Sequence, residues 1–410
     1  MEPFTLADLT GDENALAPYY SRFRVSERLL LTGHSHQAWP DAGFEGHQRA
    51  WLDAAALVDD KWQAAAEKAA LVRRHWQRLL NDPHGDIALG QNTHELVTRL
   101  LSALPLRERP RLVTTDGEFH TIGRQLRRLS EEGLEVVWVG AHPVDTLAER
   151  LIAAADDRTA CVLMSSVLYE TAEIVSGVDQ VARACSERSV HLLVDAYHHI
   201  NAVPFDIDTL GLREAFVTGG GYKYCQLGEG NAFLRIPPGC QLRPVLTGWF
   251  AEFADLERAH DGEGVGYGEG AARFAGATYD PTAHYRAAAV QAFHTEAGLT
   301  PRLLREISRH QVALLRRLIE DADCDPAIAR VEPMPEERRG GFLAIRAPRA
   351  MELAHGLALR GVHADARGDV LRLGPAPYLT DRQLRAAAGA YADLLRSAST
   401  LHGPAPRAAI

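Results

Sequence analysis

The sequence has few of the residues that build disulfide frameworks, metal clusters or methionine-rich surfaces. Its five cysteines are scattered along 410 residues, and no pair has the spacing of a metal site. Scattered cysteines in odd number are typical of a reducing compartment, so we expect a cytoplasmic protein. The 18 histidines include no HExxH motif, so no metal is predicted. Only four methionines are present, which argues against a methionine-rich binding surface.

Long apolar runs and an excess of basic charge are also absent. No stretch is long and apolar enough for a membrane helix. The acidic start MEPFTLADLTGDEN lacks the basic and apolar regions of a signal peptide. The net charge of -10 argues against nucleic-acid binding, which requires basic surface. We therefore expect neither a membrane nor a nucleic acid as partner, and a small molecule as ligand.

Apolar segments alternate with amphipathic segments between residues 105 and 196. RLVTTD, EVVWVG, ACVLMSSV and HLLVDA predict strands, with a helical pattern between each strand and the next. Such βαβ units form a mostly parallel sheet with helices on both faces. Residues 42–80 predict one or two amphipathic helices, and residues from about 281 to 323 predict a long helical stretch. GFLAIRA, GVHADAR and VLRLGPA predict strands of a smaller α+β domain, followed by a helix over 381–396.

The most informative segment runs from Leu192 to Tyr224 and reads LLVDAYHHINAVPFDIDTLGLREAFVTGGGYKY. A buried strand ends at Asp195, and roughly thirty residues later a glycine cluster precedes Lys223. A pyridoxal phosphate enzyme needs both groups. The lysine binds the aldehyde as a Schiff base, and the aspartate keeps the pyridine nitrogen protonated so that the ring accepts electrons. We predict pyridoxal 5'-phosphate as cofactor; the alternative is a Rossmann-like strand end with a surface lysine.

A helix N-terminus that could bind phosphate is predicted just after residue 90. In GQNTHELV the helix begins near Glu95, and its free N–H groups and the Thr93 hydroxyl would form an anion site. Asn92 or Thr93 could instead act only as the helix cap, and the two roles are compatible. We expect Asn92 and Thr93 to contact the cofactor phosphate.

Several motifs, in the right order, make the chain resemble the class V aminotransferase superfamily of fold-type I pyridoxal phosphate enzymes, and most specifically kynureninase. Asp195-Ala196-Tyr197-His198 resembles the family's D-x-x-H, and GGGYKY resembles its Tyr-Lys. LTGWF resembles a Gly-Trp element from the second subunit, and DARGDVLRLGPAPYLT resembles the segment that supplies a substrate-binding arginine. Two places depart from the family: residues 32–36 read TGHSH instead of a DGNSLG-like element, and residues 199–201 read HIN instead of small residues.

The resemblance implies an α/β architecture, the fold-type I pyridoxal phosphate-dependent transferase fold. Its large domain would contain a mostly parallel seven-stranded sheet, and its C-terminal domain would be smaller and α+β. We expect an N-terminal segment, 1–40, that contributes to the small domain or the active site. The large cofactor-binding domain would cover 41–290, the small domain 291–400, and a flexible tail 401–410.

The resemblance also implies roles for individual residues. Lys223 would be the cofactor lysine and proton shuttle, Asp195 the partner of the pyridine nitrogen, and His198 a neighbour of the ring. Tyr222 would contact the phosphate or transfer a proton, and Phe119 would stack on the ring. For Tyr222 and Phe119 the alternative is simple core packing.

Residues farther along the chain would serve the phosphate and the substrate. Trp249 and Thr278 would reach the phosphate of the partner subunit in a homodimer, or else only pack at the interface. Arg372 would bind the substrate α-carboxylate, because an arginine fork matches a carboxylate. Arg367 is the rival, but Arg372 falls in the alternating run 370–373, which predicts a strand.

His34 and His36 would shape the pocket for the substrate side chain, or else act as cap or core residues. The implied activity is that of a kynureninase-like hydrolase in amino-acid metabolism, specifically tryptophan catabolism. It would cleave the Cβ–Cγ bond of kynurenine or 3-hydroxykynurenine to alanine and an anthranilate.

Three other functions remain open. A class V aminotransferase, or a cysteine desulfurase or C–S β-lyase, could use the same scaffold. Cys324 is the desulfurase candidate by position, although its flanks do not resemble the loop that such an enzyme needs. A cofactor-binding protein without catalysis is a further alternative, against which the intact Lys223 and Asp195 argue.

Overall fold

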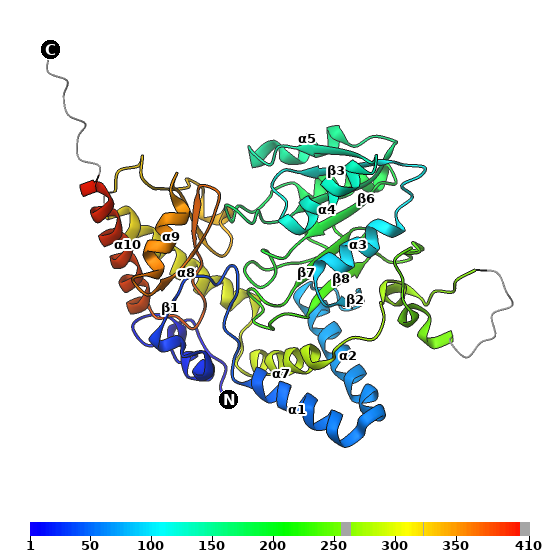
Figure 1. Cartoon of the computed structure of the whole chain (residues 1–410), viewed down its shortest axis with the longest axis horizontal. Helices are drawn as coiled ribbons and strands as arrows, with labels where there is room; N and C mark the ends of the chain where they lie inside the picture. The colour runs from blue at the N-terminus through cyan, green and yellow to red at the C-terminus, as the bar shows by residue number, and fades with distance from the viewer. Residues whose placement is uncertain (256–263, 323, 402–410) are drawn as a thin grey trace, which may run out of the picture.

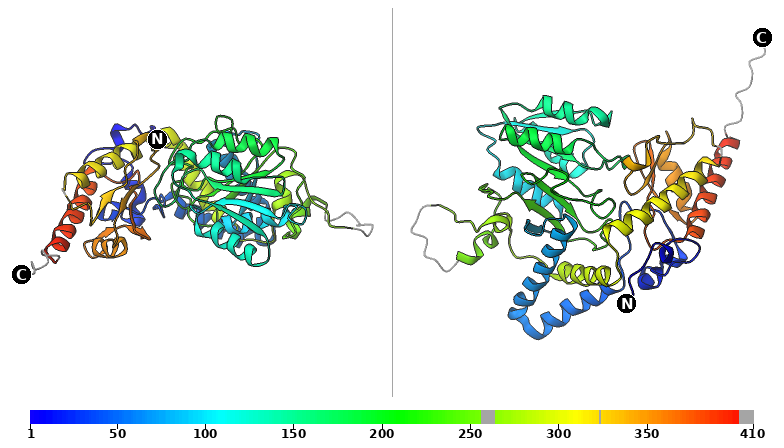
Figure 2. Two further views of the ribbon diagram at one scale, coloured as in Figure 1. Left: turned by 90° about the horizontal axis from the view of Figure 1, so that it is seen from above. Right: turned by 180° about the vertical axis from the view of Figure 1, so that it is seen from behind.

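The computed structural model describes residues 1–255, 264–322 and 324–401, and consists of two lobes (Figures 1 and 2). The larger lobe is built on a seven-stranded sheet with the order β2-β8-β7-β6-β5-β3-β4. Only β8 runs against its neighbours, β2 and β7. The predicted fold class is therefore confirmed. The strands are β2 (Asp86–Gly90), β3 (Arg111–Thr115), β4 (Glu135–Val139), β5 (Thr159–Ser165), β6 (His191–Asp195), β7 (Phe216–Gly220) and β8 (Ala232–Ile236).

Helices cover both faces of this sheet because its central strands are apolar on both faces. Val113, Val162 and Val194 point into one core, which α2, α5, α6 and α7 close. Leu163 and Leu193 point into a second core, which α3 and α4 close. The helices are α1 (Ala42–Leu57), α2 (Lys61–Leu79), α3 (Thr93–Ala103), α4 (His120–Glu131), α5 (Leu147–Ala154), α6 (Val178–Glu187) and α7 (Thr282–Glu296).

The smaller lobe combines an antiparallel sheet, in the order β12-β13-β10-β9, with a parallel pair, β1 and β11. Its strands are β1 (Leu29–Leu30), β9 (Arg330–Val331), β10 (Leu343–Arg346), β11 (Val362–His363), β12 (Asp365–Arg367) and β13 (Val370–Leu373). Its helices are α8 (Pro301–Glu320), α9 (Ala350–Ala358) and α10 (Asp381–Leu401). Short 3-10 helices lie at Ala7–Leu9, Ala17–Phe23, Val25–Glu27, Val58–Asp60, Val144–Thr146, Trp249–Asp255, Gly270–Phe274 and Glu336–Arg338.

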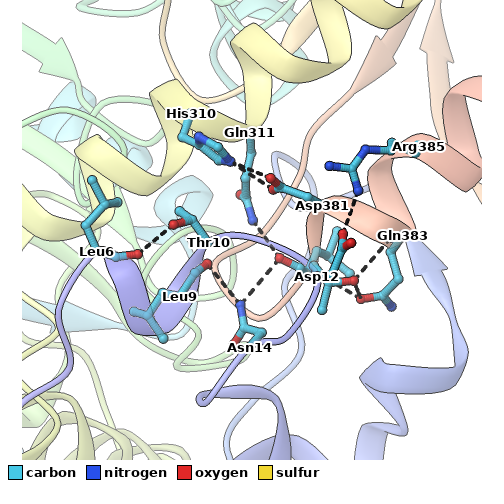
Figure 3. Close-up of polar contacts among 12 residues, drawn as sticks. Leu6, Leu9, Thr10, Asp12, Asn14, His310, Gln311, Asp381, Gln383 and Arg385 are labelled. Carbon is cyan, nitrogen blue, oxygen red and sulfur yellow. Dashed lines mark hydrogen bonds and ion pairs between the residues drawn. The ribbon is translucent and has the colours of Figure 1, made fainter.

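The N-terminal segment packs on the smaller lobe, beside α8 and α10 (Figure 1). Leu9, Leu16 and Tyr20 share one apolar core with residues of α8 and α10. Figure 3 shows the polar contacts that accompany this packing. Asn14 donates to the Leu9 and Pro377 carbonyl oxygens at 3.1 and 2.8 Å, and His310 lies 2.8 Å from Asp381. The Asn14–Pro377 contact joins residues 363 positions apart in the sequence.

The helical stretch expected from about 281 to 323 consists of two helices, α7 and α8. α7 ends before Gly298, which has φ +69°, and α8 begins at Pro301. Glycine adopts this left-handed conformation readily, and proline is favoured in the first turn of a helix. The Thr300 hydroxyl accepts a hydrogen bond from the Leu303 N–H and caps α8.

The change from one apolar core to the other falls within α7. Val290 belongs to the core of the large sheet, and Phe293 belongs to the core of the smaller lobe. The domain boundaries given above stay predictions, and residues 402–410 of the expected tail lie outside the described residues. Among the helices of the described residues, none has the length and apolar character that crossing a membrane requires.

Candidate active site

A cavity of about 320 Å³ opens where β5 and β6 end and where α3 and α4 begin. Ligands of open α/β sheets bind at this edge. The cavity brings together Lys223, Asp195, His198, Tyr222, Asn92, Thr93 and Phe119, all of which the sequence predicted as site residues. We call it the lysine cavity. Its other lining residues are Gln91, His94, Thr121, Ser165, Val167, Tyr169, Tyr197, Glu229, Gly230, Asn231 and Ala232.

Lys223 lies in this wall with 5% of its surface exposed. Its Nζ is 2.7 Å from His198 Nε2, 4.5 Å from the centre of the Tyr197 ring and 5.2 Å from that of Phe119. Burial lowers the pKa of Lys223 to about 7, although Asp195 acts in the opposite direction. A substantial fraction of the amine is therefore unprotonated near neutral pH, as nucleophilic attack and proton transfer require.

Asp195 ends β6, and its Oδ1 accepts a hydrogen bond of 2.8 Å from the Tyr197 N–H. Burial raises its pKa, against which the Tyr197 N–H and the charge of Lys223 act. The carboxylate therefore gains from a cationic ligand in the cavity, because such a ligand would stabilise its charged form.

His198 is buried and neutral at ordinary pH. Burial and the neighbouring charges of Lys223 and Arg372 hold its pKa well below the usual range. Its Nδ1 is buried and has no hydrogen-bond partner among the described residues. A buried polar atom without a partner is costly, so this atom marks a place where a polar ligand or a water would bind.

The N-terminus of α3 forms another side of the cavity. Asn92 Oδ1 accepts from the Glu95 N–H at 2.9 Å, and Glu95 Oε2 accepts from the Gln91 N–H at 3.0 Å. This reciprocal cap occupies the Asn92 oxygen. The N–H groups of Thr93 and His94 lie in the first turn, where a helix offers no acceptor. They and the Thr93 hydroxyl suit an anion.

Aromatic rings enclose the space above Lys223. Phe119 lies just before α4, and its ring meets that of Tyr169 edge-on at 5.4 Å. Tyr222 stacks on His36 at 4.8 Å with an interplanar angle of 19°. His36 is therefore at the rim, with its side chain exposed, while Tyr222 lines the cavity.

Arg372, on β13, lies behind this wall with 3% of its surface exposed. It donates from Nη1 to the Tyr169 carbonyl oxygen at 2.7 Å, so it reaches the cavity through a lining residue. Asp365 accepts from its Nε at 2.9 Å and from its Nη2 at 2.5 Å. Arg367 is more exposed and lies 3.7 Å from the same carboxylate. His34 is fully buried 2.8 Å from Asp365, behind Arg372, and is not among the residues that line the cavity.

Trp249 and Thr278 lie away from the lysine cavity of their own chain. They line a second, apolar hollow of about 740 Å³ along β2, together with Trp62, Phe250, Phe253 and Tyr279. We call it the tryptophan hollow. The Trp249 side chain is 45% exposed there. Whether either residue contacts a cofactor stays a prediction.

Four residues at the site escaped the sequence reasoning. Tyr197 stands at a position that the D-x-x-H pattern leaves open, and Asp365 precedes Arg372 on the neighbouring strand. Tyr169 carries no motif. Glu118 stands next to Phe119; it is buried and accepts from Thr115 Oγ1 and Ser165 Oγ, both at 2.7 Å. Burial raises the pKa of Glu118 to about 7, despite these hydrogen bonds.

The described residues contain no group of three or more histidine, cysteine, aspartate or glutamate side chains suited to a metal ion. The free cysteines Cys161, Cys185 and Cys225 are buried, and Cys324 packs against the apolar core of the smaller lobe. None of these cysteines lines the lysine cavity.

Comparison with known proteins agrees with this architecture. The family model of the kynureninase C-terminal domain matches residues 304–390. A kynureninase of Bacillus thuringiensis subsp. konkukian (strain 97-27) is 29% identical over 391 residues, which cover 89% of this chain and 82% of the relative. The uncharacterized aminotransferase YcbU of Bacillus subtilis (strain 168) is 24% identical, covering 82% of this chain and 86% of the relative.

Solved structures share the fold over nearly the whole chain. A C-DES variant with glycine covalently linked to its pyridoxal phosphate cofactor has a TM-score of 0.79 at 16% identity, covering 92% of this chain and 98% of that one. A cysteine desulfurase from Thermococcus onnurineus NA1 has a TM-score of 0.74 at 15% identity, with coverage of 91% and 96%. At such identities the likeness concerns the fold.

Proposed function

We propose that this chain hydrolyses the Cβ–Cγ bond of a kynurenine-type amino acid. The chain belongs to the class V aminotransferase superfamily of pyridoxal phosphate enzymes and is kynureninase-like. The products would be alanine and an anthranilate. The observation that carries the proposal is the contact between Lys223 and His198 inside a cavity that Asp195 also lines. The match of most of the chain to a kynureninase supports it.

The lysine cavity fits the cofactor. His198 Nδ1 lacks a partner, the first turn of α3 has unused N–H groups, and Asp195 is a buried carboxylate that a cationic ring nitrogen would stabilise. Lys223 would hold the aldehyde carbon, and Thr93, Asn92 and Tyr222 would hold the phosphate. When bound, the ring withdraws electrons from the substrate α-carbon.

The residues of this chain would divide the remaining work. Lys223 can accept a proton at Nζ and return it near neutral pH, because burial lowers its pKa to about 7. Asp195 would keep the ring nitrogen protonated. Phe119 would lie against the ring and keep water from one face, since its own ring already borders Lys223.

The substrate would lie between the two lobes. Arg372 would bind its α-carboxylate, with Arg367 as the rival, and both arginines lie beside Asp365. His36, at the rim, is the proposed determinant of substrate choice, whereas His34 lies behind Arg372.

We propose a homodimer as the active form. β2 is an edge strand of the large sheet, and the apolar tryptophan hollow runs along it. Large apolar surfaces favour association. Trp249 and Thr278 would then reach the phosphate site of the partner subunit.

An aminotransferase or a C–S β-lyase on the same scaffold is the alternative. A desulfurase is a weaker candidate, because Cys324 packs against the core of the smaller lobe. A desulfurase needs a mobile and reactive cysteine at the substrate.

The test is to incubate the cofactor-loaded protein with L-kynurenine, 3-hydroxykynurenine, cystine and a cysteine conjugate, and to identify the products. Anthranilate with alanine in equal amounts supports the hydrolase. Pyruvate with a thiol or persulfide supports the lyase instead, and amino transfer to an added 2-oxo acid supports the aminotransferase. Absence of anthranilate from L-kynurenine and of 3-hydroxyanthranilate from 3-hydroxykynurenine contradicts the proposal.

A further inference from the structure

The guanidinium of Arg372 is already oriented by this chain. Its Nε and Nη2 donate to the two oxygens of Asp365 at 2.9 and 2.5 Å, which is the bidentate arrangement of an arginine and a carboxylate. Its Nη1 donates to the Tyr169 carbonyl oxygen at 2.7 Å. One N–H on Nη1 and one on Nη2 therefore remain for a ligand.

Asp365 is itself held from behind by the N-terminal segment. His34 Nε2 lies 2.8 Å from Asp365 Oδ1. Burial, as the largest influence, lowers the pKa of His34 to about 4, so the imidazole is neutral and Nε2 carries the hydrogen that faces the carboxylate. Hydrogen bonds from His34 and Arg372 hold the pKa of Asp365 below its usual range, although burial acts in the opposite direction.

The backbone fixes His34 in this place. The Gly33 N–H donates to the Gly374 carbonyl oxygen at 2.7 Å, and Thr32 pairs with Gly374 in parallel register. A Cβ on Gly374 would lie 2.3 Å from His34 Nδ1, so only glycine leaves room for the imidazole. The ring also packs on Phe342 at 4.6 Å. His34 has no freedom to turn toward the cavity.

We infer that Asp365 and His34 are positioning residues that hold Arg372 in the orientation needed to bind a substrate carboxylate. This inference rests on the proposed role of Arg372 in the function above. It assigns His34 to recognition of the carboxylate, which all α-amino acids share, rather than to the choice of side chain.

Two opposed effects decide whether substitution of Asp365 strengthens or weakens the binding of a carboxylate. Removing the carboxylate charge leaves Arg372 and Arg367 uncompensated, which by Coulomb attraction would strengthen the binding of an anion. Losing the bidentate pair also lets the buried guanidinium of Arg372 turn away from the substrate carboxylate. This loss of orientation outweighs the gain in attraction, because Arg367 already supplies positive charge. We therefore expect weaker binding.

The test compares two amines that differ only in the carboxylate. Dissociation constants of L-alanine and ethylamine are measured from the visible absorbance of the cofactor-loaded protein, and their ratio reports on carboxylate recognition. Asp365→Asn should lower the preference for alanine by roughly ten- to a hundredfold, and His34→Phe by about tenfold. His34→Gln should retain most of it, because the amide N–H can still donate to Asp365.

A second histidine–aspartate pair supplies the matched control. His310 and Asp381 are also 2.8 Å apart in the smaller lobe, but they join α8 to α10 (Figure 3). Among the contacts of the described residues, neither is bonded to Arg372 or Arg367. His310→Phe and Asp381→Asn should leave the ratio unchanged.

The outcomes separate the inference from the function on which it rests. If Arg372→Lys abolishes the preference and Asp365→Asn does not, the positioning role is wrong and the role of Arg372 stands. If Arg372→Lys changes nothing, Arg372 is not the carboxylate ligand, and the role proposed for Arg372 in the function above is wrong. Tighter binding of alanine by Asp365→Asn would also overturn the inference. Equal losses in His34→Gln and His34→Phe, with unchanged circular dichroism, would remove His34 from it.

Discussion

The lysine cavity and the tryptophan hollow lie along the same chain and have opposite characters. The cavity is lined by several ionisable side chains, of which Lys223, Asp195 and His198 contact one another or backbone of the same chain. The hollow is larger and apolar, and its Trp249 and Phe253 are 45% and 59% exposed. Both regions begin at β2: the hollow runs along the strand, and the cavity lies just after its last residue.

The two regions differ in whether one subunit supplies all the groups that they need. Reactive groups must be oriented within fractions of an ångström, and the cavity already supplies the hydrogen bonds that do so. The hollow supplies apolar surface that association with a partner would remove from water. We therefore expect substitutions in the cavity to act within one subunit, and substitutions in the hollow to act through a partner.

The largest expected effect is that of Lys223→Ala. No turnover should remain, and the visible absorbance of the bound cofactor should change, because no other lysine lies in the cavity. The chain contains lysine only at positions 61, 68 and 223. Lys68→Ala on α2 is the matched control and should retain activity. Circular dichroism should show both variants folded.

An unchanged visible spectrum in Lys223→Ala would place the cofactor elsewhere. The cavity would then not be the reactive site of this chain.

Asp195→Asn should keep the cofactor and lose most of the activity. The amide oxygen can still accept from the Tyr197 N–H, so the fold should survive. An amide cannot keep the ring nitrogen protonated, and losing a charge-assisted partner in a buried site costs a few kcal/mol, roughly a hundredfold in rate. Steady-state kinetics and the absorbance spectrum check this. Near wild-type activity would mean that another group faces the ring nitrogen.

The hollow is tested by mixing two inactive variants, Lys223→Ala and Trp249→Ala, and allowing the subunits to exchange. If Trp249 acts across a dimer, each mixed dimer has one complete site, and activity should return to about one quarter of wild type. Exchange is checked by labelling the two variants differently and analysing mixed dimers. No recovery despite proven exchange would show that Trp249 acts in its own subunit, and activity of Trp249→Ala on its own would show that Trp249 is not needed.

Sequence reasoning predicted the features whose signals are local. The apolar runs around Val113, Val162 and Val194 predicted the parallel strands, because strands buried on both faces need such runs. Lys223, Asp195 and the α3 cap at Asn92 also lie in short motifs, and the structure gathers them in one cavity. The break between α7 and α8 had its signal too, since Gly298 and Thr300-Pro301 are stop and start residues.

The contacts that join distant segments had no local signal. His34 and Asp365 are 331 positions apart, and only the packing of the N-terminal segment on the smaller lobe brings them together. His34 was therefore expected at the pocket for the side chain, and its burial behind Arg372 could not be foreseen. Tyr197 was missed for a different reason: it lies between two functional residues, at a position that the D-x-x-H pattern leaves open.

The smallest effect concerns the stability of the cofactor-free protein, which should depend on pH in the cavity and not in the hollow. Lysine has a pKa of about 10.4 in an unfolded chain, whereas burial lowers that of Lys223 to about 7 in the folded chain. Between these values the unfolded chain binds a proton that the folded chain does not. Below pH 7 the burial of Lys223 therefore lowers the free energy of unfolding by its full amount. This penalty shrinks as the pH rises above 7.

Lys223→Met removes the charge and keeps an unbranched apolar side chain of similar length. The variant should be more stable than the parent at pH 7, and its advantage should fall by about 1 kcal/mol per pH unit toward pH 9. Urea unfolding at several pH values measures it. Trp249→Phe, in a hollow lined mostly by apolar side chains, should give a difference that is flat across the same range. An equally flat difference for Lys223→Met would mean that Lys223 is well solvated, which contradicts the buried cavity from which its chemistry was argued.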